Sequence, residues 1–136
     1  MSDLSKTTVN GVIVKLLNHR SEKRGMTLIP ERSRCVRTGE VHELVTTDQT
    51  DLTQGSSVER VGFIGFAEVL NAGVIEVGDL FSANGQEIGV VVGFDACHFP
   101  NHYNVLISTS QLWTAHDLHL TVGDQVALAE CAGQKP

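Results

Sequence analysis

The sequence predicts a small all-β protein, and three observations support this. Stretches of strand length that are apolar or alternate between apolar and polar residues recur along the 136-residue chain, separated by Gly, Asn, Asp or Ser. Several of the thirteen glycines stand inside apolar stretches, which is typical of β-bulges and tight corners. Helical periodicity is scarce. We therefore expect about eight short strands in a closed or half-closed β-barrel.

The expected strands cover residues 9–17, 26–29, 40–47, 58–66, 74–82, 88–94, 103–108 and 125–130. One or two short helical turns are expected, at 66–72, before Gly73, and at 110–118, with Ser110 as N-cap. Val-Gly-Asp occurs at 77–79 and at 122–124, where Gly permits a positive φ and Asp can bond the turn backbone. Because no linker divides the chain, we expect one domain over 1–136, with flexible ends at 1–8 and 132–136.

Composition and cysteine usage exclude several classes of protein. A chain of this length buries a core without disulfides, and its three cysteines are widely spaced with no CxxC. We therefore expect reduced thiols, neither a zinc ribbon nor a disulfide framework. No apolar run approaches the roughly 20 residues that cross a bilayer, and the first residues lack the apolar region of a signal peptide. A cytoplasmic protein without a membrane partner is expected.

Charge is unevenly distributed along the chain. The net charge is −6, but residues 1–39 hold eight Lys and Arg against three Asp and Glu. An acidic protein is a poor general binder of nucleic acid, so no nucleic-acid partner is expected. The opposed charges of the two parts could instead drive association into a homo-oligomer. The usual nucleotide, hydrolase and calcium motifs are absent from the sequence.

The densest group of chemically versatile side chains lies in the loop from Asp95 to Asn104. The group comprises Asp95, Cys97, His98, Asn101, His102 and Asn104. Imidazole and thiolate bind transition metals, so His98, His102 and Cys97 are candidate ligands for a divalent transition metal. His98 and His102 with Asp95 are also candidate catalytic acids and bases. The alternative is a hydrogen-bonded hairpin loop whose Asp and Asn side chains cap backbone amides.

A polar strand precedes this loop in the sequence. On an extended strand Glu40, His42 and Leu44 share one face, whereas Val41, Glu43 and Val45 share the other. Glu40 and His42 could point together into a barrel mouth, with His42 as a further catalytic candidate. The alternative is a surface strand with its polar residues toward water.

A basic run lies upstream and comprises Arg20, Lys23, Arg24, Arg32, Arg34 and Arg37. Arginine forms bidentate bonds with carboxylate and phosphate, so Arg34 and Arg37 are candidates for orienting an anionic substrate. Glu40, Asn101 and Asn104 complete the expected ligand-binding set. The alternative is that these cations pair with the acidic remainder of the chain.

Two hypotheses follow. The first is a binder of a small anionic ligand or metal, with or without catalysis, in which the 95–104 loop lies beside the strand Glu40–Glu43. The second is a non-catalytic oligomeric assembly module. The sequence leaves open whether the protein is an enzyme.

Three stretches resemble a small bacterial family of unknown function: SRCVRTGEVHELV (33–45), RVGFIGFAEV (60–69) and GFDACHFPNHYNVLI (93–107). This resemblance implies a compact β-rich domain. VGFIGFAEVLNAG (61–73) and GFDACHFPNHYNV also resemble, more weakly, the glucitol-specific IIA component of the sugar phosphotransferase system. That family is a β-barrel that carries a phosphoryl group on a histidine, which implies this role for His42. The histidine pattern around the family's site is not reproduced here.

Overall fold

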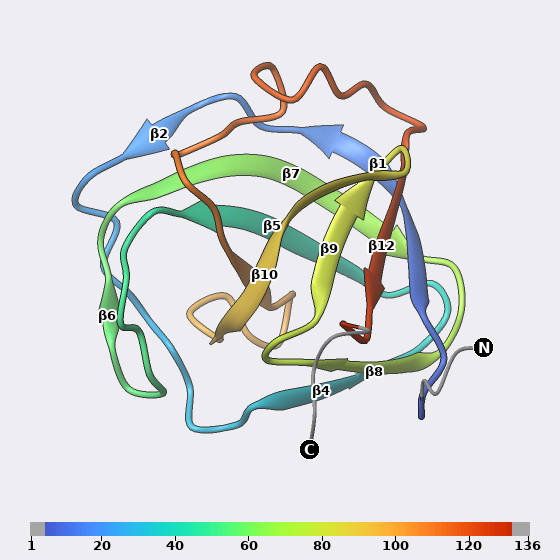
Figure 1. The fold of residues 1–136 in the computed structure, drawn as a ribbon, viewed down its shortest axis with the longest axis horizontal. Coiled ribbons are helices and arrows are strands. Elements are labelled where there is room, and N and C mark those ends of the chain that lie inside the picture. The colour runs from blue at the N-terminus through green and yellow to red at the C-terminus, as the bar shows by residue number, and fades with distance from the viewer. Residues whose placement is uncertain (1–4, 132–136) are drawn as a thin grey trace.

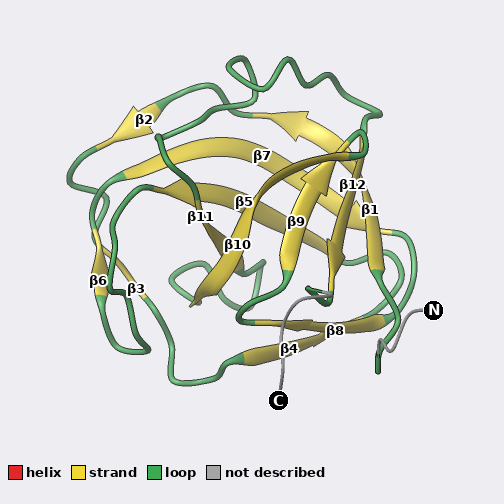
Figure 2. Ribbon diagram, in the orientation of Figure 1, coloured by secondary structure: helices red, strands yellow, loops and turns green. Residues whose placement is uncertain are grey.

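The computed structural model describes residues 5–131. These residues contain twelve strands and no helix (Figure 2). The strands are β1 Val9–Leu16, β2 Arg20–Ser21, β3 Met26–Thr27, β4 Ser33–Val36, β5 Val41–Thr47, β6 Ser57–Val58, β7 Val61–Val69, β8 Gly73–Glu76, β9 Leu80–Ala83, β10 Gln86–Asp95, β11 Asn104–Ser108 and β12 Gln125–Ala129. The predicted all-β class is confirmed. The same described residues contain no helix long and apolar enough to span a bilayer.

Seven strands form a closed ring in the order β1-β12-β9-β10-β11-β5-β7, and pairing of β1 with β7 closes it (Figure 1). β2 pairs with the N-terminal end of β7, while β3–β6 and β4–β8 form two separate antiparallel pairs. Within the ring, β11 pairs with β5 in parallel and the other neighbours are antiparallel. The parallel pair aligns Asn104 with Glu43.

Both turns predicted from Val-Gly-Asp are confirmed. Gly78 and Gly123 adopt φ angles of 99° and 98°. In each turn the Asp carboxylate accepts the backbone N–H three residues earlier, 2.8 Å from Glu76 N to Asp79 and 2.8 Å from Thr121 N to Asp124. The first turn divides the stretch predicted as one strand at 74–82 into β8 and β9.

The helical turn predicted at 66–72 is wrong, because β7 continues to Val69. This part of β7 pairs with β1 on one side and β5 on the other, and two ladders of hydrogen bonds outweigh a local helical preference. The second helical turn, predicted at 110–118, is wrong as well: residues 115–119 form a turn, in which Leu118 N–H donates to Thr114 O over 3.2 Å. Thr114 rather than Ser110 caps this turn, because its hydroxyl accepts Asp117 N–H at 3.4 Å while the Asp117 carboxylate accepts Thr114 N–H at 3.0 Å.

Apolar side chains pack on both faces of β5. Leu44 belongs to the large core inside the ring, whereas Val45 belongs to a second cluster on the outer face beneath β3 and β6. The same alternation holds on β11, where Val105 faces inward and Leu106 outward. On β5, His42 and Glu43, which precede Leu44 and Val45, therefore lie on opposite faces of the ring.

The flexible ends predicted at 1–8 and 132–136 lie mostly outside the described residues, since 1–4 and 132–136 are not described. Within the described part, Lys6 Nζ pairs with Asp79 Oδ2 at 2.6 Å, and Asp79 is buried. Burial lowers the pKa of Lys6, but its hydrogen bonds to Asp79 and Glu76 outweigh burial and raise the pKa above its usual value. Flexibility of the ends stays a prediction.

Gly65 lies in β7 where the strand pairs with β1 on one side and β5 on the other, and its φ is +146°. A Cβ at this position would collide with the Lys15 carbonyl oxygen. We expect Gly65→Ala to lower the free energy of unfolding by at least about 3 kcal/mol, because strain and a backbone clash add. Gly85→Ala is the matched control, since φ is +79° there and the space is open. Gly85→Ala should lower the free energy of unfolding by only about 1 kcal/mol. Urea unfolding followed by Trp113 fluorescence measures both variants. Equal losses in the two variants would contradict the role assigned to Gly65.

Candidate functional site

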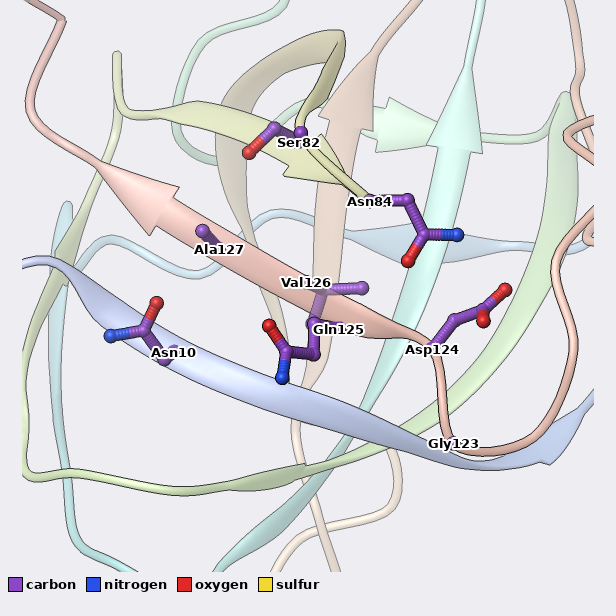
Figure 3. Close-up of a pocket in the computed structure, with 9 residues that line it drawn as sticks. Asn10, Ser82, Asn84, Gly123, Asp124, Gln125, Val126 and Ala127 are labelled. Atoms are coloured by element: carbon purple, nitrogen blue, oxygen red, sulfur yellow. The ribbon is translucent and has the colours of Figure 1, made fainter.

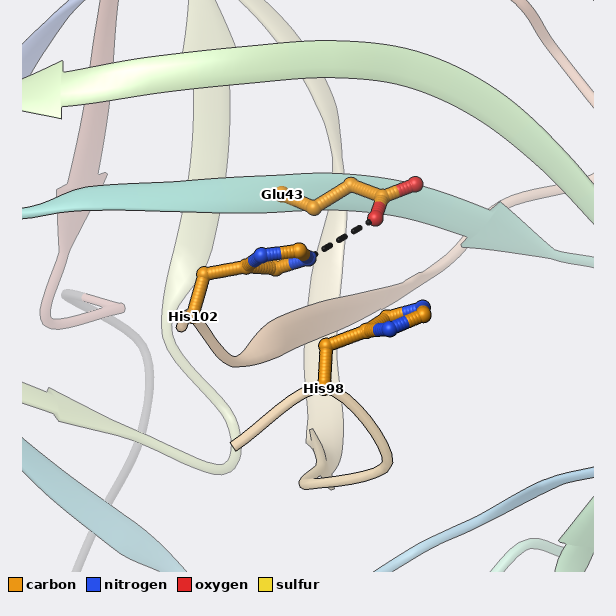
Figure 4. A group of neighbouring side chains, drawn as sticks. All are labelled: Glu43, His98 and His102. Atoms are coloured by element: carbon orange, nitrogen blue, oxygen red, sulfur yellow. Dashed lines mark hydrogen bonds and ion pairs between the residues drawn. The ribbon is translucent and has the colours of Figure 1, made fainter. Parts of the chain in front are cut away.

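Glu43, His98 and His102 converge on the outer face of the ring (Figure 4). One ligating atom from each residue lies within 4.8 Å of the others. Glu43 and His102 are 5% and 8% exposed, and His102 Nε2 lies 3.2 Å from Glu43 Oε1. His98 is exposed and stacks on His102 with ring centroids 5.0 Å apart. A buried carboxylate–imidazole pair is thus joined by a second imidazole at the surface.

The pairing of three strands places these groups. Asp95 on β10 is aligned with Asn104 on β11, which is aligned with Glu43 on β5. Side chains aligned across neighbouring strands point to the same face, so the three form one polar row on the outer side. His102 enters this face from the loop just before β11, and the edge of the Phe66 ring packs against it at 5.0 Å.

The 95–104 loop folds into consecutive turns that bring its two histidines together. Asn101 N–H donates to His98 O at 2.8 Å, and His102 N–H donates to the same oxygen at 3.3 Å. Asn101 Nδ2 lies 3.2 Å from His102 Nδ1 and donates to it. With Nδ1 accepting, the proton of the neutral ring stands on Nε2 and points at Glu43. Asn101 therefore orients His102.

Asp95 fastens the loop to its surroundings. Its carboxylate accepts hydrogen bonds from Thr27 N at 2.9 Å, Cys97 N at 3.0 Å and Asn104 Nδ2 at 3.0 Å. Burial alone would raise the pKa of Asp95, but the hydrogen bonds from Cys97, Thr27 and Asn104 outweigh it and lower the pKa. These bonds engage both carboxylate oxygens, and the catalytic role of Asp95 stays a prediction. The alternative of a hydrogen-bonded loop describes Asp95 well.

Cys97 and Asn104 adjoin the cluster without joining its ligating atoms. Cys97 Sγ lies 3.6 Å from Asn104 Nδ2 and 3.7 Å from Arg24 Nη2. Burial and the Asp95 carboxylate raise the pKa of the Cys97 thiol, which disfavours the thiolate that binds metals. Asn104 Oδ1 is buried and has no hydrogen-bond donor among the described residues. Its amide nitrogen is held by Asp95, so this oxygen is turned away from that carboxylate.

His42 occupies the opposite face of β5 and does not join the two loop histidines. Its Nε2 lies 2.7 Å from Glu40 Oε1, and its Nδ1 accepts Tyr103 N–H at 3.1 Å. Because Nδ1 accepts, the ring is neutral and Nε2–H donates to Glu40. Burial lowers the pKa of His42 and outweighs the hydrogen bond to Glu40, which raises it. Both nitrogens of His42 are engaged.

The basic run separates in space. Arg34 stacks its guanidinium on the Tyr103 ring at 3.6 Å and lies 4.0 Å from Glu40, on the His42 side. Arg37 is exposed and supplies its backbone N–H to Glu40. Arg20 pairs with Asp117, and Arg32 donates to Gln54 at 2.8 Å. Arg24 alone of this run contacts the cluster, with Nη2 3.1 Å from His98 Nε2.

Two residues of the site were missed as individual candidates. Alternation along residues 40–45 predicts that Glu43 lies on the face opposite His42, as it does, but nothing in the sequence indicates that the histidine loop lies on that face. Arg24 is identified in the sequence only as part of the basic run. The alternation of residues 40–45 is the signal that could have found Glu43, provided that the parallel pairing of β5 and β11 was known.

A hollow beside β1, β9 and β12 shares no lining residue with this cluster (Figure 3). Its lining is mainly of uncharged polar side chains, among them Asn10, Asn84 and Gln125. Asp124 is its ionisable member, and that carboxylate already caps the Thr121 turn. This groove offers no group of acids, bases or metal ligands.

The environment of His42 predicts a pH dependence of stability. Since its pKa lies below 6.5 in the folded protein, the unfolded chain binds more protons as pH falls below about 6.5. The free energy of unfolding should therefore decrease below that pH, by at most about 1.4 kcal/mol per pH unit from this group. His42→Gln should lose this component of the slope in urea unfolding between pH 7.5 and 5.5. His116→Gln, at an exposed side chain, should keep it. Parallel pH profiles for wild type and His42→Gln would refute the assignment.

Comparison with known proteins identifies the family of this chain but assigns it no activity. No curated protein and no solved structure matches the chain, and no match supports the likeness to the glucitol-specific IIA component. Residues 3–129 match the model of a family described as "Family of unknown function (DUF6917)". Since this match spans nearly the whole chain, the expected resemblance to a family of unknown function is confirmed. The chain belongs to that family.

Proposed function

We propose that this protein binds a divalent transition metal ion through Glu43, His98 and His102. The convergence of two imidazoles and one buried carboxylate within 4.8 Å is the observation that carries the proposal. A hydrogen bond from His102 to Glu43 would suffice to fasten the loop. A third ligating group stacked on that pair is what a metal centre requires and an anchoring pair does not.

The ligand set indicates the kind of metal and the kind of site. Two imidazole nitrogens and one carboxylate oxygen suit zinc, iron, cobalt or nickel in their divalent states. Structural zinc sites use four protein ligands, whereas catalytic sites use three and leave a position for water or substrate. Three ligands at the protein surface therefore favour a centre at which a small molecule can bind.

Closing the cluster around an ion requires a small movement. A tetrahedral ion with bonds of about 2.1 Å holds its ligand atoms roughly 3.4 Å apart, which is less than the present 4.8 Å limit. Glu43 lies in a central strand and His102 is buried, so both are held in place. His98 is on an exposed turn and is the group that can move inward.

An ion at His102 Nε2 would take the place of the proton now directed at Glu43. The neutral ring would then carry its proton on Nδ1, and the Asn101 amide would have to turn its oxygen toward that nitrogen to accept it. A further feature fits this function. Asn104 Oδ1 lies in the same polar row as Glu43 and is buried without a donor. Buried acceptors almost always have a partner, and a water bound to the ion would supply one.

Phosphoryl transfer to His42 has less support. Its Nδ1 accepts the Tyr103 N–H and its Nε2 bonds Glu40, while the ring is 7% exposed. Phosphorylation of either nitrogen would break one of these bonds and place a charged group in a buried position.

Titration of metal-free protein with Co²⁺ or Zn²⁺ tests the proposal. We expect one ion per chain, with proton release, because the ligands bind in their deprotonated forms. Glu43→Gln, His98→Gln and His102→Gln should each weaken binding by at least about 100-fold, since even residues that only support a ligand contribute 10- to 100-fold. Calorimetry and the visible absorption of Co²⁺ provide the measurements.

His116→Gln is the matched control, because this exposed histidine lies outside the cluster and should leave the affinity unchanged. His98→Gln is the most informative variant, since an exposed side chain can be replaced with little risk to the fold. Wild-type protein that binds no divalent transition metal at micromolar concentration would refute the proposal. Equal losses in His98→Gln and His116→Gln would refute the ligand assignment.

A further inference from the structure

Another hollow, of about 230 Å³, is lined by residues from the start of β10 and from the segment that follows β11. Its lining includes Glu87, Ile88, Trp113, Asp117, Leu118 and His119. It shares no residue with the cluster of Glu43, His98 and His102. Pockets for drug-sized ligands measure about 300–1,000 Å³, so this hollow suits a smaller molecule.

One side of the hollow is apolar and is held in place by hydrogen bonds. Ile88, Trp113 and Leu118 line it and are each half-buried. The buried Thr46 hydroxyl donates to Trp113 O at 2.8 Å, and Trp113 N–H donates to Gln111 O at 2.9 Å. These two bonds fix the backbone of Trp113. The chain has no other tryptophan, so its fluorescence reports on this hollow.

The charged side chains of the hollow are carboxylates. Glu87 and Asp117 line it, and residues 61–131 hold eight Asp and Glu but neither Lys nor Arg. Asp117 is already engaged, because its carboxylate accepts the Thr114 N–H at 3.0 Å and pairs with Arg20. Glu87 is exposed and forms no ion pair within the described part of the chain. Arg20 offsets the charge of Asp117, so the charge of Glu87 is the one left uncompensated.

We infer that this hollow binds a small alkylammonium ion, independently of the proposed metal centre. The ammonium group donates to the Glu87 carboxylate, and the alkyl part packs against Trp113 and Leu118. A cation close to an indole ring also gains a cation–π attraction. An unprotonated His119 ring, which lines the same hollow, offers the ammonium group a further acceptor. An anion would be repelled by Glu87, and a neutral alcohol would lack both electrostatic attractions.

Titration with n-butylammonium at pH 8 tests this inference, with Trp113 fluorescence and calorimetry as the measurements. We expect saturable binding. Neutral n-butanol, which has nearly the same shape, should bind more weakly, and butyrate should not bind. Glu87→Gln should weaken binding of n-butylammonium about three- to fivefold, the loss expected for an ion pair near the surface. Trp113→Leu, followed by calorimetry, should weaken it about two- to fivefold, since it removes the aromatic ring and keeps an apolar side chain.

Glu31→Gln is the matched control, because it removes the same charge from an exposed side chain outside the hollow. It should leave the affinity for n-butylammonium unchanged, and so should His98→Gln, which alters only the metal cluster. Wild-type protein without a saturable response to n-butylammonium would overturn the inference, as would equally tight binding of n-butanol. Equal losses in Glu87→Gln and Glu31→Gln would overturn it too. A loss in His98→Gln would place the ammonium ion at the metal cluster and likewise overturn this site.

Discussion

The parallel pairing of β11 with β5 determines which side chains of two distant polar segments meet. It aligns Asn104 with Glu43, and His102, two residues before Asn104, then reaches the same carboxylate. A parallel pair needs a long connection, and here residues 48–103 supply it, with three strands of the ring, β7, β9 and β10. Closure of the ring through β1 and β7 fixes the position of β5 from its other side, since β7 pairs with both. The candidate centre therefore depends on the whole topology and not on the histidine loop alone.

The alternation of β5 separates two polar groups that are neighbours in sequence. His42 faces Glu40 and Tyr103 on one side, and Glu43 faces His102 on the other. Slippage by one residue would exchange the faces, bringing Glu43 toward the inner core and Leu44 toward the histidines. Apolar residues on both faces after position 43 prevent such slippage, because Leu44 and Val45 each pack in a separate cluster. Packing of the strand thus specifies the chemistry of the site.

Much of the fold was predictable from local pattern, and the site was predictable only in part. Alternation and glycine turns located most strands, because each is a property of a few consecutive residues. The two-residue strand β2 and the strand β4 carry too little pattern to be recognised, and residues 66–72 show how pairing overrides local preference. The histidine loop was correctly identified as the densest group of versatile side chains. Its partners Glu43 and Arg24 could not be chosen, because strand order is a long-range property that alternation does not encode.

Stability alone does not account for the polar composition of this face. Replacing both partners of a buried hydrogen bond by apolar groups of the same shape can be nearly neutral or stabilising, so a hydrophobic pair could anchor the loop as well as Glu43 and His102 do. Asp95 already fastens the loop with three hydrogen bonds. The remaining polar groups are also arranged unequally, with Glu43 and His102 buried and His98 at the surface. In the proposed metal centre, Glu43 and His102 would be two buried ligands held in place and His98 an exposed third one, which would make the centre preorganised yet open to exchange. A centre that exchanges small ligands needs both properties, and a structural anchor needs neither.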